Sequence, residues 1–549
     1  MSTFYTTKLK RIYGADLARQ ISPRLQNLVE QYRGRIPIPT EPSLTERDAF
    51  LITYGDQVRE TDKLPLQTLR VFCESHLRRV ISGIHILPFY PWSSDDGFSI
   101  MDYRAVNPTL GNWHDVKHLG NSFRIMVDGV INHASAQGDW FRAFLREEIP
   151  YRDYFLTVEG NHDLSQVVRP RALPLLTEFQ TISSKRHVWT TFSTDQVDLD
   201  FHNPDVLLEI FDILLMYAAL GAQFIRLDAV AYLWKEIGTT CIHLPQTHAI
   251  IQLLRAVFDE VAPHVHLITE TNVPHMENIS YFGDGYNEAQ LVYNFALPPL
   301  LLHTFRTRDT SILSEWASEL DLPSERTTFF NFLASHDGIG LNPVRGILSP
   351  ADIDALVDRT LAHGGLISCK QNSDGTQSSY ELNINYFDAL SDPVSEEPLS
   401  IQIDRFMAAQ AIMLSLRGVP GIYFHSLFGS RNWLEGVQAN HYNRAINRQK
   451  LDRISMEDEL ADQNSLRSQV FGRYSHLLSQ RGSSAAFHPN GGQKILNVGR
   501  GVFGVLRNSL DGMQHVLCLH NVTSQTQVVS QPNSAHTLEP FQTLWLVIP

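Results

Sequence analysis

Two ionisable side chains at the end of a short apolar run could carry out nucleophilic chemistry. Residues 224–228 read FIRLD, and because side chains alternate along a strand, Arg226 and Asp228 point to the same face. A guanidinium beside a carboxylate keeps the carboxylate ionised and lowers its pKa, as an attacking nucleophile requires. Taken alone, the pair is equally well explained as a structural ion pair at a strand end.

Three further stretches have the same form, an apolar run that ends in polar residues. They are residues 123–133, 265–271 and 328–338. Their polar ends carry His133 in the first, Glu270 in the second, and His336 with Asp337 in the third. In a closed parallel barrel of strand–helix units the carboxyl ends of the strands converge on one face, where active sites lie. The four stretches together therefore predict a catalytic face rather than four unrelated strand ends.

The motifs DGVINH, FIRLDAV, LITET and LASHD, in this order, resemble the four signature regions of the α-amylase family of retaining α-glucoside enzymes. The resemblance extends over most of the chain. It implies that Asp228 is the nucleophile, Glu270 the general acid/base and Asp337 the carboxylate that stabilises the transition state. The neighbours agree with these roles, since Asp228 has an arginine beside it and Glu270 lies between threonines.

The same resemblance implies a glucosyl-binding set. Arg226 would hold the nucleophile ionised, while His133 and His336 would donate hydrogen bonds to the glucose. The run DDGF resembles a loop of sucrose-phosphorylase-type enzymes whose aspartate binds glucose hydroxyls, which assigns that role to Asp95. Arg444, in YNRAINR, matches an arginine that touches glucose there. The alternatives are a solvated turn for Asp95 and satisfied buried imidazoles for the histidines.

The acceptor side is predicted from two further stretches. RPR places Arg169 and Arg171 in one turn, and arginine forks match phosphate oxygens. Tyr380 and Glu381 lie in a loop-like run, GTQSSYELNIN. Both stretches resemble phosphate- and acceptor-binding loops of sucrose-phosphorylase-like enzymes, and Arg169 or Lys370 would meet an acidic group of the acceptor. For the arginine pair, a solvated basic turn is the alternative.

The strings VRPRALPLLTEFQ, GTTCIHLPQTH, TETNVPH and GSRN bring the chain nearest to the glucosylglycerate phosphorylases within the sucrose-phosphorylase-like branch. Val168 departs from the true sucrose phosphorylases, which have a tyrosine before RPR. The resemblance implies reversible phosphorolysis of 2-O-α-D-glucosylglycerate to α-D-glucose 1-phosphate and D-glycerate by double displacement. Alternatives are phosphorolysis of sucrose 6′-phosphate, sucrose or glucosylglycerol, an α-glucoside hydrolase or transglucosidase, and a non-catalytic scaffold.

The elements that must position these residues predict an α/β fold, a (β/α)8 TIM barrel with additions. With 549 residues the chain exceeds a single core of about 250–300 residues. The expected parts are a helical N-terminal extension (1–45), the barrel (46–133 and 199–484), a small domain inserted after strand 3 (134–198), an acceptor-side loop or insert region of the barrel (342–400) and a C-terminal all-β domain (485–549).

Composition excludes several classes of function. A net charge of −14 argues against nucleic acid and anionic membranes as partners. The four cysteines have no CxxC spacing, the N-terminus lacks a signal-peptide core, and no G-x-S-x-G or HExxH motif is present. We expect a cytoplasmic enzyme without metal or cofactor, whose partners are a small glucoside, inorganic phosphate as co-substrate and an acidic acceptor such as glycerate. The sequence makes no prediction of the oligomeric state.

Overall fold

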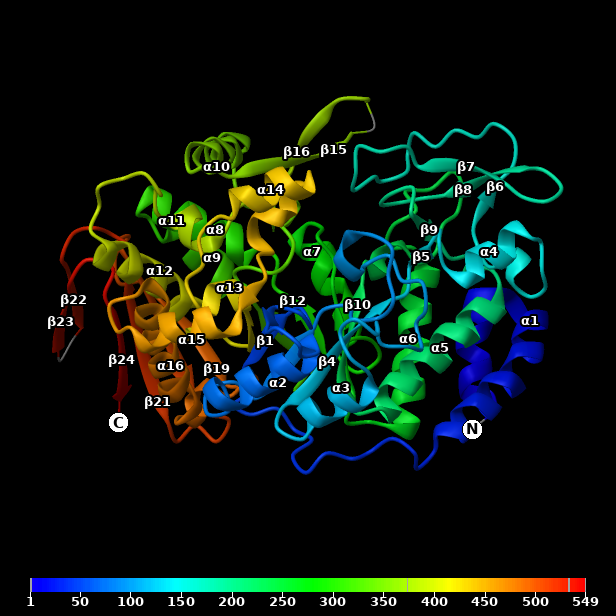
Figure 1. The fold of residues 1–549 in the computed structure, drawn as a ribbon. Helices are drawn as coiled ribbons and strands as arrows, with labels where there is room; N and C mark the ends of the chain where they lie inside the picture. Colours follow the sequence, from blue (N-terminus) through cyan, green and yellow to red (C-terminus); the bar gives the residue numbers. More distant parts are fainter. Residues whose placement is uncertain (1, 373, 532–533, 549) are drawn as a thin grey trace.

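A computed structural model describes residues 2–372, 374–531 and 534–548. Eight parallel strands close into a barrel at its centre (Figure 1). They are β1 (Phe50–Thr53), β3 (Gly83–Ile86), β4 (Arg124–Val130), β10 (Ala222–Asp228), β11 (His266–Thr269), β12 (Leu291–Tyr293), β13 (Thr328–Asn331) and β17 (Val419–Tyr423). Their order around the barrel follows the chain, and β17 closes on β1. The predicted (β/α)8 barrel is confirmed.

The barrel strands are shorter than the apolar runs that predict them, because the polar ends of the runs leave the sheet. Asp228 is the last residue of β10, Glu270 follows β11 directly, and Asp337 lies six residues beyond the end of β13. The sheet thus fixes where each run starts, and the loops that follow carry the polar groups to one face.

Phenylalanine rings fill the interior of the barrel. The rings of Phe50 and Phe224 lie 4.7 Å apart between centroids although their strands are not neighbours in the sheet, so the contact crosses the interior. Glycines on adjacent strands make room for these rings. A Cβ atom at Gly83 would lie 2.2 Å from Phe50, and one at Gly421 would lie 2.2 Å from Phe330.

Gly421→Ala is therefore expected to destabilise the protein by about 1–3 kcal/mol, the usual cost of overpacking a filled core. Urea unfolding followed by tryptophan fluorescence would measure the change. Gly472→Ala is the matched control, because this helical glycine has no neighbour within 4 Å of its missing Cβ, and alanine there should be neutral or stabilising. An unchanged midpoint for Gly421→Ala would contradict the packing described for the barrel.

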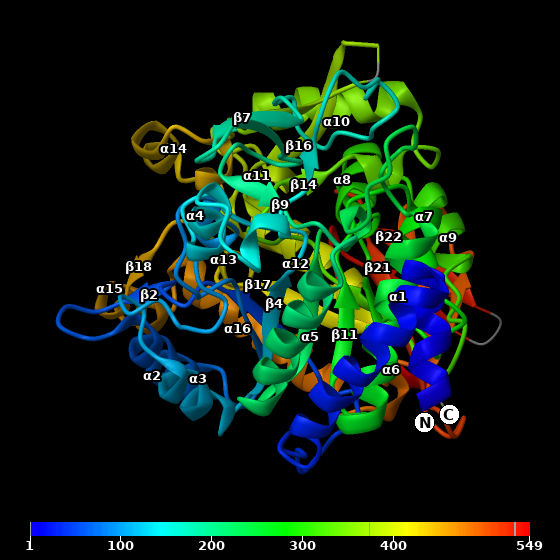
Figure 2. The same cartoon turned by 90° about the vertical axis from the view of Figure 1, so that its right-hand side faces the viewer.

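Helices form the outer layer of the barrel, and a long N-terminal helix covers part of that layer. The outer helices include α2 (Pro65–His76), α3 (Trp113–Gly120), α5 (Pro204–Ala219), α6 (Pro245–Val261), α8 (Leu297–Thr307) and α12 (Leu399–Ser415). The N-terminal helix α1 (Ser2–Tyr32), broken at Gly14, packs against α5 and α6 (Figure 2). Tyr32 donates a 2.7 Å hydrogen bond to Asp212 on α5, and Tyr5 bonds to Glu260 on α6.

A small domain interrupts the barrel after β4. It begins with β5 (His133–Ser135), which pairs with β9 (Gln196–Asp198), so both ends of the insertion are fastened beside the third barrel strand. Between them lie α4 (Asp139–Leu145) and a sheet of β6 (Thr157–Val158), β7 (Leu176–Gln180) and β8 (Lys185–Trp189). The domain therefore stands on the face to which the polar strand ends point (Figure 1).

The acceptor-side loop or insert region 342–400 contains helices and a β-hairpin, and its polar run 363–383, expected to be a loop, supplies the two strands of the hairpin. After α10 (Pro350–Ala362), β15 (Leu366–Gln371) pairs antiparallel with β16 (Gln377–Asn383), and β14 (Ile339–Gly340) extends this sheet. The polar composition of the run predicts a loop, but β16 pairs with β14 and β15 on its two sides and its last four residues, 380–383, are buried. Tyr380 and Glu381 are thus held on a strand.

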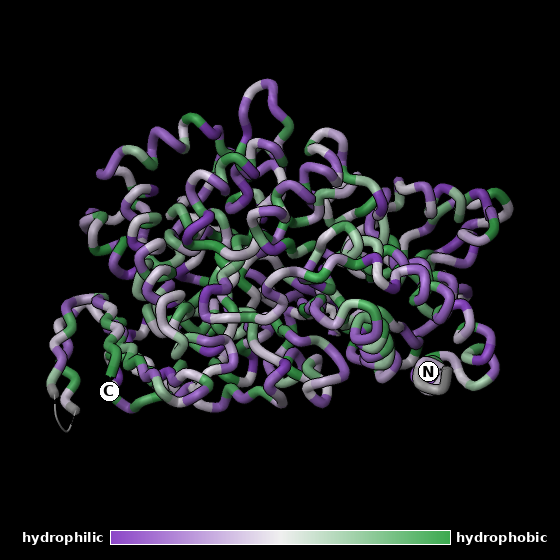
Figure 3. Tube along the Cα trace, turned by 90° about the horizontal axis from the view of Figure 1, so that it is seen from below, coloured by the Kyte–Doolittle hydropathy of each residue, from purple (hydrophilic) through white to green (hydrophobic). Residues whose placement is uncertain are grey.

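The C-terminal domain is all-β. Its sheet consists of β19 (Gly492–Leu496), β20 (Val502–Asn508), β21 (His515–Asn521) and β24 (Thr543–Ile548). A hairpin, β22 (Gln527–Gln531) and β23 (Ser534–Leu538), projects from the side of the molecule (Figures 1 and 3). Further helices are α7 (His275–Ile279), α9 (Ser311–Ser318), α11 (Tyr386–Leu390), α13 (Phe424–Leu427), α14 (Leu434–Asn440), α15 (Arg453–Ala461) and α16 (Leu466–Gly482). None of the helices in the described ranges is long and apolar enough to span a bilayer.

Candidate active site

A pocket at the carboxyl ends of the barrel strands gathers most of the predicted site residues. It contains about 690 Å³ of space, part of it open to solvent. The predicted residues that line it are Asp95, His133, Arg171, Asp228, Glu270, His336, Asp337, Tyr380, Glu381 and Arg444. Three predicted residues, Arg226, Arg169 and Lys370, are not among the residues that line it.

Arg226 is a buried cation shared by three carboxylates. Its Nη1 lies 2.8 Å from Asp228 and also contacts Asp128, while its Nη2 is 3.7 Å from Glu270. Asp128 in turn contacts His85 at 2.8 Å. The side chain of Arg226 is 2% exposed. Arg226 therefore pairs with Asp228, as the alternation of side chains along the strand predicts. Its guanidinium also interacts with Asp128 and Glu270.

Burial reverses one expectation about the acidity of Asp228. Burial raises the pKa of Asp228, and the attraction of Arg226 does not compensate for it because Asp128 and Asp337 add negative charge nearby. The predicted lowering of the pKa of Asp228 is thus wrong. Burial also raises the pKa of Glu270, to about 8, opposed by Arg226. Since Arg226 is closer to Asp228 than to Glu270, Asp228 is the better anion and Glu270 the better acid.

The turn after the nucleophile holds the acid. Ala229 has a left-handed backbone, φ +49°, which non-glycine residues adopt at a cost of about 1–3 kcal/mol. In that conformation the Ala229 N–H donates a 3.2 Å hydrogen bond to Oε2 of Glu270. The end of β10 and the turn after it therefore set the positions of both reacting carboxyl groups, one as the Asp228 side chain and the other through the Ala229 amide.

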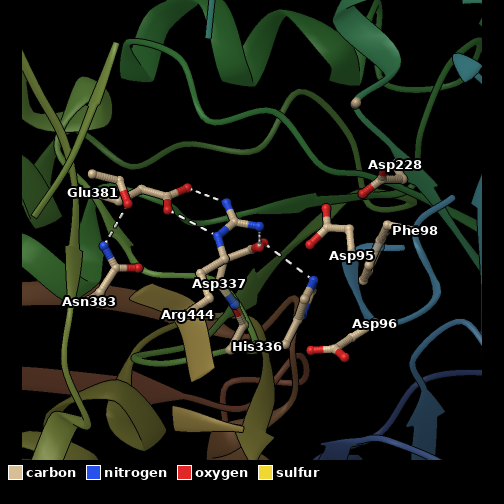
Figure 4. Close-up of polar contacts among 12 residues, drawn as sticks. Asp95, Asp96, Phe98, Asp228, His336, Asp337, Glu381, Asn383 and Arg444 are labelled. Carbon is tan, nitrogen blue, oxygen red and sulfur yellow. Dashed lines mark hydrogen bonds and ion pairs between the residues drawn. The ribbon is translucent and has the colours of Figure 1, made fainter. Parts of the chain in front are cut away.

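Asp337 is held as an anion. Burial alone would raise its pKa, but Arg444, His336 and Arg448 together keep the pKa of Asp337 well below its usual range. Arg444 contacts Oδ1 of Asp337 directly, and His336 lies 3.4 Å from Oδ2 (Figure 4). A permanent negative charge at this point can stabilise positive charge that develops on a sugar ring.

Aromatic and histidine side chains form the wall of the glucosyl side. Phe98 stacks on His336, with ring centroids 4.6 Å apart and planes 4° apart. His133 donates a 2.9 Å hydrogen bond from Nε2 to the carbonyl oxygen of Phe98. Asp95 faces this wall, and the amide of Gln196 lies 3.5 Å from its Oδ2. The predicted glucosyl residues Asp95, His133 and His336 are thus brought together on one side of the pocket.

The loop of Asp95 is anchored by residues that sequence reasoning missed. Asp95 and Asp96 both have left-handed backbones, φ +52° and +49°. Asp96 accepts hydrogen bonds from Arg448 at 2.8 Å and from the Tyr442 hydroxyl at 2.5 Å. Arg448 also lies 3.6 Å from Asp95. The sequence does carry a signal for Arg448, which is the second arginine of the motif YNRAINR. Only the first arginine of that motif, Arg444, is predicted to have a role.

The acceptor side joins the inserted domain to the β15–β16 hairpin. Nη1 of Arg171 is 3.7 Å from Glu381, and its guanidinium lies 5.7 Å from the centre of the Tyr380 ring. Arg444, predicted to touch glucose, bridges Asp337 and Glu381 (Figure 4). Other lining residues that no spacing signal singled out are Phe192, Gln196, Tyr232, Asn272 and Phe295.

Arg169 and Lys370 do not line the pocket. Arg169 donates a 2.9 Å hydrogen bond to the carbonyl oxygen of Leu173 in its own turn, which fits the solvated basic turn better than acceptor binding. Lys370 lies on β15, outside the lining residues. Within the ranges that the structure describes, no group of three or more His, Cys, Asp or Glu side chains could hold a metal ion.

Comparisons with known proteins identify the family of the chain. The catalytic-domain model of alpha amylases matches residues 79–337. The glucosylglycerate phosphorylase of Spirochaeta thermophila is 52% identical over 97% of this chain and 91% of its own, and that of Escherichia coli is 45% identical over 98% and 99%. The crystal structure of sucrose 6F-phosphate phosphorylase from Thermoanaerobacter thermosaccharolyticum superposes with a TM-score of 0.77 at 23% identity, covering 93% of this chain and 100% of that one, which shows the shared fold. The chain belongs to the α-amylase family, in the group formed by the glucosylglycerate phosphorylases.

Proposed function

We propose that the protein is a retaining phosphorylase that converts 2-O-α-D-glucosylglycerate and inorganic phosphate to α-D-glucose 1-phosphate and D-glycerate, reversibly. The observation that carries the proposal is the 45–52% identity, over nearly the whole chain, to proteins named glucosylglycerate phosphorylase. The pocket supports it, because a complete set of three carboxyl groups for glucosyl transfer faces an arginine, Arg171, on the acceptor side.

The first step would transfer glucose to the protein. A carboxylate oxygen of Asp228 attacks the anomeric carbon while Glu270 gives its proton to the departing O2 of glycerate, so the C1–O2 bond breaks as the C1–Asp228 bond forms. The pKa of about 8 keeps Glu270 protonated for this task at neutral pH. Asp337 stabilises the positive charge that develops on the sugar ring in between.

The second step would regenerate the nucleophile. A phosphate oxygen attacks the anomeric carbon from the face that glycerate left, the C1–Asp228 bond breaks, and Glu270 accepts a proton where the attacking oxygen carries one. Two inversions give net retention, hence α-glucose 1-phosphate. The reaction as proposed needs no cofactor or metal, with phosphate as its co-substrate. A cytoplasmic location is part of the proposal, because all four cysteines are free thiols, as in a reducing compartment.

Purified protein incubated with glucosylglycerate should release glucose 1-phosphate only when phosphate is present. In the synthetic direction, with glucose 1-phosphate as donor, glycerate should be a better acceptor than glycerol, fructose or fructose 6-phosphate. Free glucose released at an equal rate without phosphate would instead indicate a hydrolase. A preference for fructose 6-phosphate would indicate the sucrose 6′-phosphate alternative.

A further inference from the structure

A carboxylate occupies the part of the pocket where the proposed function requires anions to bind. Glu381, on β16, is 1% exposed and lines the pocket between two arginines. Arg444 donates from Nε to Oε2 at 3.1 Å and contacts Oε1 from Nη2, and Nη1 of Arg171 lies 3.7 Å from Oε1. A negative side chain here would repel phosphate and glycerate alike, unless it makes a specific contact with them.

The two arginines differ in the donors that they can offer. All three guanidinium nitrogens of Arg444 have a partner: Nη1 contacts Asp337, and Nε and Nη2 contact Glu381 (Figure 4). Arg171 is 24% exposed as a side chain, and its 3.7 Å approach to Glu381 is too long for a hydrogen bond. No hydrogen bond joins the Arg171 guanidinium to another residue of the described chain. An incoming anion therefore finds its free donors on Arg171, with the Glu381 carboxylate beside them.

Two neighbouring anionic groups bind together when a proton lies between them. An O–H donor facing a carboxylate forms a short, strong hydrogen bond, whereas a bare anionic oxygen at the same place is repelled. The oxygens of Glu381 each accept from Arg444 and keep a further lone pair for such a donor. Both ligands of the proposed function carry one. Phosphate retains a P–OH group at neutral pH, and the glycerate unit of the glucoside retains its 3-hydroxyl next to its carboxylate.

We propose that Glu381 determines the specificity of the acceptor side by accepting a hydrogen bond from a hydroxyl of the bound anion, while Arg171 binds a negative oxygen of the same anion. One pair of side chains thereby serves both half-reactions, for phosphate through P–OH and for glycerate through the 3-hydroxyl. Anions that carry no proton are rejected. This inference rests on the proposed function, since it concerns how that reaction selects its two anionic ligands.

Sulfate is the probe, because it has the shape of phosphate but no proton at neutral pH. In the wild-type protein, sulfate should compete with phosphate only weakly. Glu381→Gln replaces one carboxylate oxygen by an N–H group, which can donate a hydrogen bond to sulfate. The ratio of the inhibition constant for sulfate to the KM for phosphate should therefore be roughly 10- to 100-fold lower in this variant than in the wild type. The ratio is measured on active molecules only, so it does not depend on how much of the variant folds.

Glu277→Gln is the matched control. Glu277 is a carboxylate on α7 that contacts His243 and is 51% exposed, and it does not line the pocket, so its substitution should leave the wild-type ratio unchanged. An unchanged ratio in Glu381→Gln, in a protein whose wild type forms glucose 1-phosphate, would overturn this inference and leave the proposed function standing. A wild type that forms no glucose 1-phosphate from phosphate would overturn the proposed function and this inference together.

Discussion

Asp228→Asn is expected to lower the turnover number for glucosyl transfer by roughly 10⁴-fold or more, as loss of a nucleophile does in other enzymes with covalent intermediates. Asparagine has nearly the shape of aspartate and can still contact Arg226, 2.8 Å away in the native pair. What it lacks is the negative oxygen that must form the bond to the anomeric carbon. Phosphate-dependent release of glucose 1-phosphate from glucosylglycerate measures the effect.

A second variant separates a missing nucleophile from a damaged fold. Asp228→Ala leaves a space beside the anomeric carbon in which azide can attack, while Glu270 still protonates the leaving group. Azide should therefore restore cleavage of glucosylglycerate without phosphate, and the product should be the β-glucosyl azide, since one displacement inverts the carbon. Undiminished transfer of glucose to or from phosphate by Asp228→Asn would contradict the assignment and remove the basis for the roles of Glu270 and Asp337.

The barrel and its catalytic carboxyl groups could be predicted because their signals are local. Each apolar run fits one short strand, and the polar residue that ends it is carried to the same face in every strand. Asp228 and Glu270 illustrate this, since one ends β10 and the other follows β11 directly. The pairing of Arg226 with Asp228 needs only the alternation of side chains along a strand.

The anchoring of the Asp95 loop could not be predicted because its partners are far apart in the sequence. Arg448 and Asp96 are separated by 352 residues and meet only because the end of the barrel turns back over the loop after β3. Spacing carries no information about such contacts. The same holds for Arg171 and Glu381, which approach each other from the inserted domain and from the hairpin.

The acidity of the nucleophile shows how tertiary structure can reverse a local argument. In the sequence, Arg226 is the only charged neighbour of Asp228 within the strand. In the folded protein, the parallel pairing of β10 with β4 places Arg226 beside Asp128. One guanidinium therefore interacts with several carboxylates, and all of these carboxylates are buried away from water. The reaction needs Asp228 as the anion and Glu270 as the acid. That order is retained, because Arg226 donates a 2.8 Å hydrogen bond to Asp228 but lies 3.7 Å from Glu270.

Glu270→Gln is expected to lower the turnover number for glucosylglycerate by roughly 10²- to 10⁴-fold, the usual contribution of a general acid. Glycerate is a poor leaving group and needs a proton at O2, whereas fluoride leaves with little protonic help. The variant should therefore still cleave α-glucosyl fluoride at close to the wild-type rate of glucosyl transfer to Asp228. Comparing the two donors, by glycerate and fluoride release in stopped assays, isolates proton donation from binding and from the nucleophile.

The pH dependence gives an independent check on the same residue. The pKa of Glu270 is raised to about 8 by burial, and the protonated form is the active one for phosphorolysis. Wild-type kcat/KM for glucosylglycerate should thus fall about tenfold per pH unit above pH 8, because this parameter reports groups of the free enzyme. In Glu270→Gln the decline at high pH should disappear. If Glu270→Gln keeps the decline at high pH, Glu270 is not the acid, because the glutamine amide does not titrate. If the variant loses cleavage of α-glucosyl fluoride and of glucosylglycerate equally, Glu270 is not the acid either, because fluoride leaves without a proton from the enzyme.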